Sequence, residues 1–131
     1  MPVAQKRILI VDDEPGLLFS LSAYLQDANF EVVGTTTGEK ALGLLEDDTF
    51  DAVIIDVRLP GKDGNEVIHQ AKQNGCQATF IIHTGSTDYV VPTSLRQLGL
   101  IQEDVFYKPI TNLENFCATL RKRLKFYLKS R

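Results

Sequence analysis

The feature that most constrains this chain is an alternation of two hydrophobic patterns along its 131 residues. Short, β-branched apolar runs typical of buried strands alternate five times with segments whose apolar residues recur every three or four positions, as in helices. Such alternation with short connections predicts a parallel sheet with helices on both faces, joined by right-handed crossovers. The expected strands are 7–11, 30–34, 52–56, 78–83 and 104–107.

A helix is expected after each strand. The first begins near Pro15, a residue suited to a first helical turn. The fourth is expected to be short, beginning at Pro92 and ending at Gly99. Each of the other helices has apolar residues that should be buried. They are Leu17, Leu18, Leu21, Leu25 and Ala28 in the first helix, Ala41, Leu42 and Leu45 in the second, Val67, Ile68 and Ala71 in the third, and Leu113, Phe116, Leu120, Leu124 and Leu128 in the fifth.

Aspartates follow two of the predicted strands. Asp12 and Asp13 come directly after the first strand, and Asp56 ends the third. Open α/β folds bind their ligands at this carboxyl edge of the sheet. An isolated aspartate is more often a helix cap or a loop residue. Three crowded carboxylates repel one another unless a cation or a shared proton compensates. Their joint placement therefore suggests a magnesium-dependent site in which one aspartate reacts.

Polar residues also follow the last two strands. Thr84 follows the fourth and Lys108 the fifth. Alone, the threonine would be read as the start of a loop and the lysine as a solvated surface residue. Because parallel strands end at one edge of the sheet, these side chains can converge on the aspartates.

The order of these short motifs resembles the receiver domain of two-component response regulators. They are Asp12-Asp13, Asp56 with the turn Pro60-Gly-x-Asp-Gly64, Thr84, and Lys108-Pro109. The resemblance runs from residue 6 to about residue 128, so residues 1–131 are expected to be a single receiver domain. It implies an α/β fold of the flavodoxin-like (βα)5 type, a doubly wound parallel five-stranded sheet in order 2-1-3-4-5. Hydrophobic periodicity alone does not give this order.

The resemblance also implies a role for each acidic residue. Asp56 would be the nucleophile that takes a phosphoryl group from a phosphohistidine and becomes an aspartyl phosphate. Asp13 and Asp56 would bind Mg²⁺ directly and Asp12 through water, while the backbone carbonyl of Arg58 would supply another oxygen. The site is thus expected to use Mg²⁺ as its cofactor.

The remaining roles concern the phosphoryl oxygens. Lys108 would supply a positive charge and Thr84 a hydroxyl donor. Gly85 would leave the approach to Asp56 open. The Lys108-Pro109 bond is, by the same resemblance, a candidate cis peptide that directs the lysine into the site.

Composition and charge narrow the class of protein further. With 44% hydrophobic and 24% charged residues, the chain is typical of a globular domain. It has no apolar run of membrane-spanning length and no signal peptide, and Cys76 and Cys117 lack metal-type spacing. A cytoplasmic protein with free thiols and no membrane association is expected.

Residues 121–131 carry six basic residues and no acidic one, and we interpret this segment as a solvated helix end. Direct nucleic-acid binding is not expected, since no aromatic platform or recognition helix accompanies them.

Three other functions receive less support. The segment 34–40 superficially suggests a phosphate loop, but its spacing is wrong and Ala41 follows Lys40. A flavin phosphate loop would have to follow the first strand, which ends in acidic residues. A metal-dependent phosphatase would carry a second aspartate two residues after the nucleophile, where this chain has Arg58.

The chain departs from the receiver pattern at one position. Receivers commonly carry Tyr or Phe three residues before the lysine as a switch, and here that residue is Val105. We therefore expect phosphorylation to reshape residues 84–92, with helix four, strand five and helix five as the binding face for a downstream protein. The expected upstream partner is a histidine kinase or a histidine phosphotransfer protein.

Two alternatives stay open. One is a constitutive protein-interaction domain whose switch is impaired, and the other is a receiver fragment of a longer regulator. His83 is interpreted as a core histidine with its hydrogen bonds satisfied, and His69 as a helix-surface residue.

Overall fold

The computed structural model describes the backbone of residues 5–129 and the side chains of residues 5–124. Five parallel strands form one sheet in the order β2-β1-β3-β4-β5, which confirms the order that the receiver resemblance implies. The strands are β1 (Arg7–Val11), β2 (Glu31–Thr35), β3 (Ala52–Ile55), β4 (Thr79–Thr84) and β5 (Val105–Tyr107).

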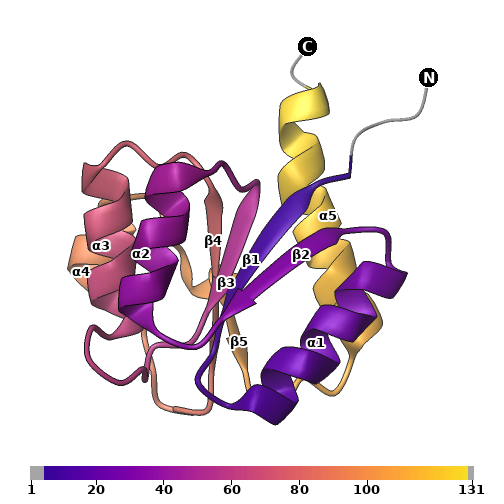
Figure 1. The fold of residues 1–131 in the computed structure, drawn as a ribbon, viewed down its shortest axis with the longest axis horizontal. Coiled ribbons are helices and arrows are strands. Elements are labelled where there is room, and N and C mark those ends of the chain that lie inside the picture. The colour runs from indigo at the N-terminus through magenta and orange to yellow at the C-terminus, as the bar shows by residue number, and fades with distance from the viewer. Residues whose placement is uncertain (1–4, 130–131) are drawn as a thin grey trace.

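Helices cover both faces of this sheet (Figure 1). Their bounds are α1 (Pro15–Asp27), α2 (Gly38–Asp47), α3 (Gly64–Gln73), α4 (Thr93–Arg96) and α5 (Leu113–Lys129). The α2, α3 and α4 helices pack on one face, and α1 and α5 pack on the other. The predicted doubly wound architecture is therefore confirmed.

The central strands are apolar on both sides because each face contributes to its own core. Along β3, Val53 and Ile55 pack against α2, α3 and α4, whereas Ala52 and Ile54 pack toward α1 and α5. All four side chains are buried. This explains why the strand reads as a continuous apolar run rather than as an alternating pattern.

Local signals set the starts of the second and third helices. The hydroxyl of Thr37 accepts a hydrogen bond from the Lys40 amide and caps α2. Thr37 thus belongs to a helix cap and not to a phosphate loop. Asp63 caps α3 in a reciprocal capping box with Glu66, which offsets the unpaired amides of the first turn.

The fourth helix is a single turn, short as expected, but it begins at Thr93 rather than Pro92 and ends at Arg96 rather than Gly99. It follows Pro92, and the chain turns away at Gly99, whose φ is +101°. A 3-10 helix, η1 (Gln102–Asp104), follows and was not predicted. Its buried Asp104 accepts a hydrogen bond from the Ile101 amide and forms an ion pair with Arg123 of α5.

Several predicted boundaries and burials need correction. The strands β2, β4 and β5 begin one residue later than predicted, and β3 ends before Asp56. Five of the predicted core side chains are only half-buried: Leu17, Leu18, Ala28, Leu45 and Leu113. The other predicted core side chains within the described residues are buried. The side chain of Leu128 and those of the basic residues after Leu124 lie outside the described part of the chain.

Both cysteines are free thiols, Cys76 half-buried and Cys117 buried. Across the described residues, no helix combines the length and the apolar character needed to cross a bilayer.

Candidate functional site

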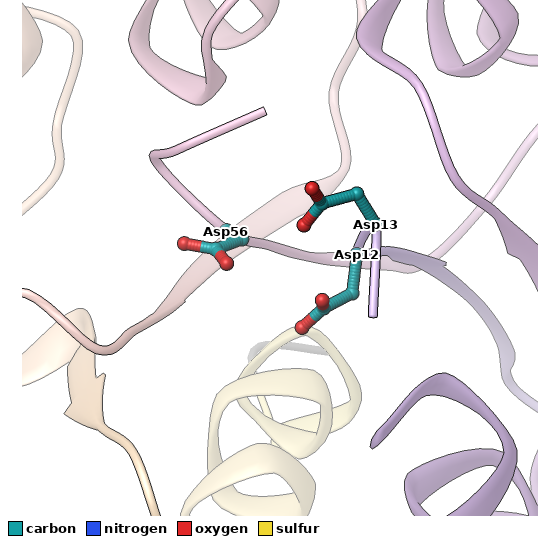
Figure 2. Close-up of side chains that lie close together, drawn as sticks. All are labelled: Asp12, Asp13 and Asp56. Atoms are coloured by element: carbon teal, nitrogen blue, oxygen red, sulfur yellow. The ribbon is translucent and has the colours of Figure 1, made fainter. Parts of the chain in front are cut away.

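The three aspartates meet at the carboxyl edge of the sheet, as predicted. The β1–β3 pairing sets Val11 beside Ile55, so the residues that follow these strands become neighbours. One carboxylate oxygen from each of Asp12, Asp13 and Asp56 lies within 4.8 Å of the others. Figure 2 shows the three side chains at the ends of the two strands. Asp12 and Asp56 are buried, whereas Asp13 is exposed.

Lys108 supplies the positive charge of this cluster. Its Nζ lies 2.8 Å from Oδ2 of Asp56, 2.9 Å from Oδ2 of Asp12 and 2.9 Å from Oε1 of Glu14. Burial by itself would lower the pKa of the Lys108 amine. Hydrogen bonds to Asp56, Glu14 and Asp12 outweigh that cost, so the pKa is raised above its usual value and the lysine stays charged.

Asp13 is the carboxylate that this lysine leaves unpaired. Among the described residues, the ion pairs of Lys108 include Asp12, Glu14 and Asp56, and none reaches Asp13. Hard divalent cations prefer oxygen ligands, and Mg²⁺ typically takes one or two carboxylates in addition to water and phosphate. The donor set therefore fits Mg²⁺, with Asp13 free to contribute the extra negative charge.

The loop after Asp56 folds back toward the end of β3. The Arg58 amide donates a hydrogen bond to Oδ1 of Asp56 at 3.2 Å, and the Gly64 amide donates to the Val57 carbonyl at 2.8 Å. A Cβ atom on Gly64 would overlap the Asp56 carbonyl oxygen. This glycine is required by the close approach of two backbone segments.

Thr84 lies at the end of β4 and is fully buried. Its hydroxyl oxygen accepts a hydrogen bond from the Ser86 amide at 3.1 Å. The Lys108 amide donates to the Thr84 carbonyl at 2.7 Å, which joins the ends of β4 and β5. A Cβ built on Gly85 would meet only the Lys108 side chain at 3.9 Å. A small side chain would therefore fit at residue 85.

The peptide bond between Lys108 and Pro109 is cis, which confirms the expectation from the resemblance. Val105 occupies the position at which receivers commonly carry an aromatic residue. Its side chain is buried in the core on the α2, α3 and α4 side of the sheet. Tyr107, two residues further along β5, is partly exposed, with 37% of its surface accessible.

His83 corrects one interpretation of the sequence. It is buried on β4, but its Nε2 atom has no hydrogen-bond partner among the described residues, so it is not a fully satisfied core histidine. Burial lowers the pKa of His83, and the Lys108 charge lowers it further, against opposing contributions from Asp12, Asp56 and Glu14. The ring is therefore held neutral. His69 is half-buried on α3.

Two site residues were missed by reading the sequence. Glu14 is largely exposed but binds Lys108, and its own amide donates to Oδ1 of Asp12 at 2.9 Å. Its position directly after the aspartate pair was the available signal. Ser86 accepts a hydrogen bond from Nε of Arg58 at 2.6 Å, a contact that bridges the loops after β3 and β4. No sequence pattern links residues 58 and 86.

Comparison with known proteins is consistent with this geometry. The family profile of the response regulator receiver domain matches residues 8–121. Response regulator MprA of Mycolicibacterium vanbaalenii is 33% identical over 125 residues, which cover 95% of this chain and 52% of that protein. The chain spans about half or less of the length of the first curated relatives that it matches.

Solved structures agree in both fold and sequence. A CheY-like receiver domain protein from Methanospirillum hungatei aligns with a TM-score of 0.80 and 25% identity, over 98% of this chain and all of that one. Response regulator TrrA of Thermotoga maritima, solved in complex with Mg²⁺ and BeF, aligns with a TM-score of 0.72 and 28% identity over 92% of this chain and 99% of that one. With a matching profile over most of its length and a five-stranded sheet of order 2-1-3-4-5 whose carboxyl edge carries three aspartates, this chain belongs to the response regulator receiver domain family.

Proposed function

We propose that this protein is a phosphoacceptor in a two-component or phosphorelay system, with Asp56 as the residue that is phosphorylated. One observation carries the proposal: Asp56 ends a central strand beside Lys108, with Asp12 and Asp13 at the same sheet edge, in a chain of the receiver family. Residues 1–131 are proposed to act as one receiver domain in the cytoplasm, with its core at about residues 6–128.

The proposed reaction moves a phosphoryl group from a histidine to an aspartate. An Oδ atom of Asp56 attacks phosphorus while the bond from phosphorus to the histidine nitrogen of the donor breaks. The imidazole leaves with the bonding electron pair and recovers a proton from solvent. The donor is a histidine kinase or a histidine phosphotransfer protein. The receiver thus catalyses its own phosphorylation and slow hydrolysis and is not proposed to turn over a separate substrate.

Asp13, Asp56 and the backbone carbonyl of Arg58 are the proposed direct Mg²⁺ ligands, with Asp12 contributing through water. When bound, the ion neutralises charge on the phosphoryl oxygens as they approach the carboxylate cluster. The crowding of three carboxylate oxygens within 4.8 Å supports this assignment. The solved complex of the relative TrrA with Mg²⁺ and BeF supports it as well.

Lys108 and Thr84 are proposed to hold the transferred group. The Lys108 ammonium already lies 2.8 Å from Asp56, so it needs only a small movement to bind an oxygen of a phosphoryl group on that residue. The Thr84 hydroxyl accepts a hydrogen bond from the Ser86 amide, which leaves its own proton available for donation.

The consequence of phosphorylation is proposed to be a change in a protein-binding surface formed by α4, β5 and α5. Two apolar side chains near this surface are exposed, Val90 at 61% and Ile101 at 47% of their area. Both side chains are available to contact a downstream protein partner. The rival function is a constitutive interaction domain, which Val105 favours because it lacks the ring of an aromatic switch.

Acetyl phosphate tests the chemistry directly. Incubation with Mg²⁺ should add one phosphoryl group, detected by intact mass, and the modification should be absent in Asp56→Asn and in wild type with EDTA. Asp47→Asn, a change on the far end of α2, is the matched control and should be modified like wild type. Equal modification of Asp56→Asn would overturn the assignment. A phosphorylated protein whose partner binding is unchanged would favour the constitutive domain.

A further inference from the structure

Two side chains from the β5 region hold the segment that connects β4 to α4. The Tyr107 hydroxyl donates a hydrogen bond to the Tyr89 carbonyl at 2.7 Å. The Gln102 side chain accepts from the Val91 amide at 3.1 Å and donates to the Tyr107 hydroxyl at 2.8 Å and to the Tyr89 carbonyl at 3.4 Å. We call Tyr107 and Gln102 the latch. It fixes the backbone at residues 89 and 91 against the edge strand.

The latch connects to Thr84 through a continuous series of hydrogen bonds. The Thr84 hydroxyl accepts from the Ser86 amide at 3.1 Å, and the Ser86 carbonyl accepts from the Tyr89 amide at 3.0 Å. The Tyr89 carbonyl then accepts from Tyr107. A change in how Thr84 directs its hydroxyl therefore acts on the amide at residue 86 and on the turn that ends at residue 89.

The same segment is anchored to the site by two further contacts. Nε of Arg58 donates to the Ser86 hydroxyl at 2.6 Å, and the Tyr89 hydroxyl donates to Oδ1 of Asn65 at 2.8 Å. Residue 58 lies two positions after Asp56, and Asn65 is at the start of α3. The segment thus bridges the phosphorylation site and the latch.

Val105 is unable to take part in this network. Its side chain is apolar and packs into the buried core, so it offers neither a hydroxyl nor an exposed ring. Tyr107 has both, and it lies partly at the surface close in sequence to the exposed Ile101. The polar contacts that reach the loop from β5 come from residue 107.

We propose that the latch transmits the state of Asp56 to the surface around β5, in place of an aromatic residue at position 105. This inference rests on the proposed function. In the unmodified protein the latch is closed. A phosphoryl group on Asp56 takes a hydrogen bond from Thr84, the turn at residues 86–89 shifts, and the closed latch becomes less populated. Opening changes how Tyr107, Val90 and Ile101 are presented to a partner.

The first experiment measures the latch in the unmodified protein. Tyr107→Phe keeps the ring and removes the hydroxyl, and Gln102→Ala removes the other half of the latch. Amide hydrogen exchange of residues 89–91 should accelerate at least roughly threefold to tenfold in each variant, because each variant loses more than one of the hydrogen bonds that hold this segment. Tyr24→Phe on α1 is the matched control and should exchange like wild type. Equal exchange in Tyr107→Phe and wild type would overturn the latch.

The second experiment measures transmission, with beryllofluoride and Mg²⁺ as the probe. In wild type the probe should accelerate exchange at residues 89–91, and the ratio of the rates with and without the probe should be the same in Val105→Ala. In Tyr107→Phe, where the Tyr107 half of the latch is already lost, the acceleration should fall to less than half of the wild-type value. The same acceleration in all three proteins would overturn the role of residue 107. Failure of acetyl phosphate to modify Asp56 would contradict the proposed function instead, while the first experiment still decides whether the latch exists.

Discussion

Nζ of Lys108 lies 2.8 Å from Oδ2 of Asp56, although 52 positions separate the two residues in the chain. Both side chains are largely withdrawn from solvent, and Lys108 also binds Asp12 and Glu14. The lysine is therefore the counter-ion of the resting site as well as the proposed ligand of a phosphoryl group. The buried carboxylates of Asp12 and Asp56 depend on it for compensation, whereas Glu14 is also exposed to solvent.

Removal of this charge should destabilise the fold. Lys108→Met keeps an apolar stem of similar length, and it should lower the free energy of unfolding in EDTA by about 1–3 kcal/mol, because buried carboxylates lose a charged hydrogen-bond donor. Urea denaturation measures the change. Lys40→Met, at an exposed position on α2, is the control. In the double variant with Asp56→Asn the cost of losing Lys108 should shrink. Additive effects would contradict the pairing.

Asp13 should matter for metal binding but not for the stability of the metal-free fold. It is exposed and not paired by Lys108, so Asp13→Ala removes repulsion without leaving an unpaired donor. In EDTA the variant should be as stable as wild type or more so. Millimolar Mg²⁺ should raise the melting temperature of wild type, since a ligand selective for the native state stabilises it, and should leave Asp13→Ala unchanged. Asp47→Ala is the control and should respond like wild type. An unchanged wild-type melting temperature would rule out the metal site.

Gly64 should be intolerant of any side chain. A Cβ at this position would overlap the Asp56 carbonyl oxygen, so Gly64→Ala must displace the loop that follows the phosphorylation site. The expected loss of stability is about 2 kcal/mol or more, with weaker phosphorylation of Asp56. Gly43→Ala is the contrasting control, because nothing lies within 4 Å of its Cβ and it sits inside α2. It should stabilise the protein by about 0.5–1 kcal/mol. Thermal unfolding and acetyl phosphate labelling test both variants, and equal effects would contradict the close approach.

His83 should make stability sensitive to mild acid. Burial, aided by Lys108, holds its pKa below the ordinary 6.5, so the unfolded chain takes up a proton at a higher pH than the folded one. Stability from this group is therefore complete above about pH 6.5 and declines as the pH falls below it. In metal-free buffer, the loss between pH 7.5 and pH 5.5 should be smaller in His83→Met than in wild type. His69→Gln serves as the control. Identical pH profiles for His83→Met and wild type would show that His83 does not carry the effect.

The sequence by itself determined which residues could form the site. The apolar run before Asp56 and the run before Asp12 identify buried strands, and parallel strands that end in polar residues bring those residues to one edge. The short fourth helix was also predictable, because Pro92 and Gly99 restrict the backbone locally. These features depend on the hydrophobic period and on local dihedral preferences, and both are determined by residues that are close together in the sequence.

Only the tertiary structure decided which of these groups touch. Periodicity does not order the strands, so the contact of Lys108 with Glu14, 94 positions away, follows from the pairing of β1, β3, β4 and β5. The unpartnered Nε2 of His83 and the binding of Tyr107 to the Tyr89 carbonyl depend in the same way on which elements pack against each strand end. A side-chain hydrogen bond requires atoms about 3 Å apart, and distances of that order between remote residues are fixed by strand register and helix packing rather than by local sequence.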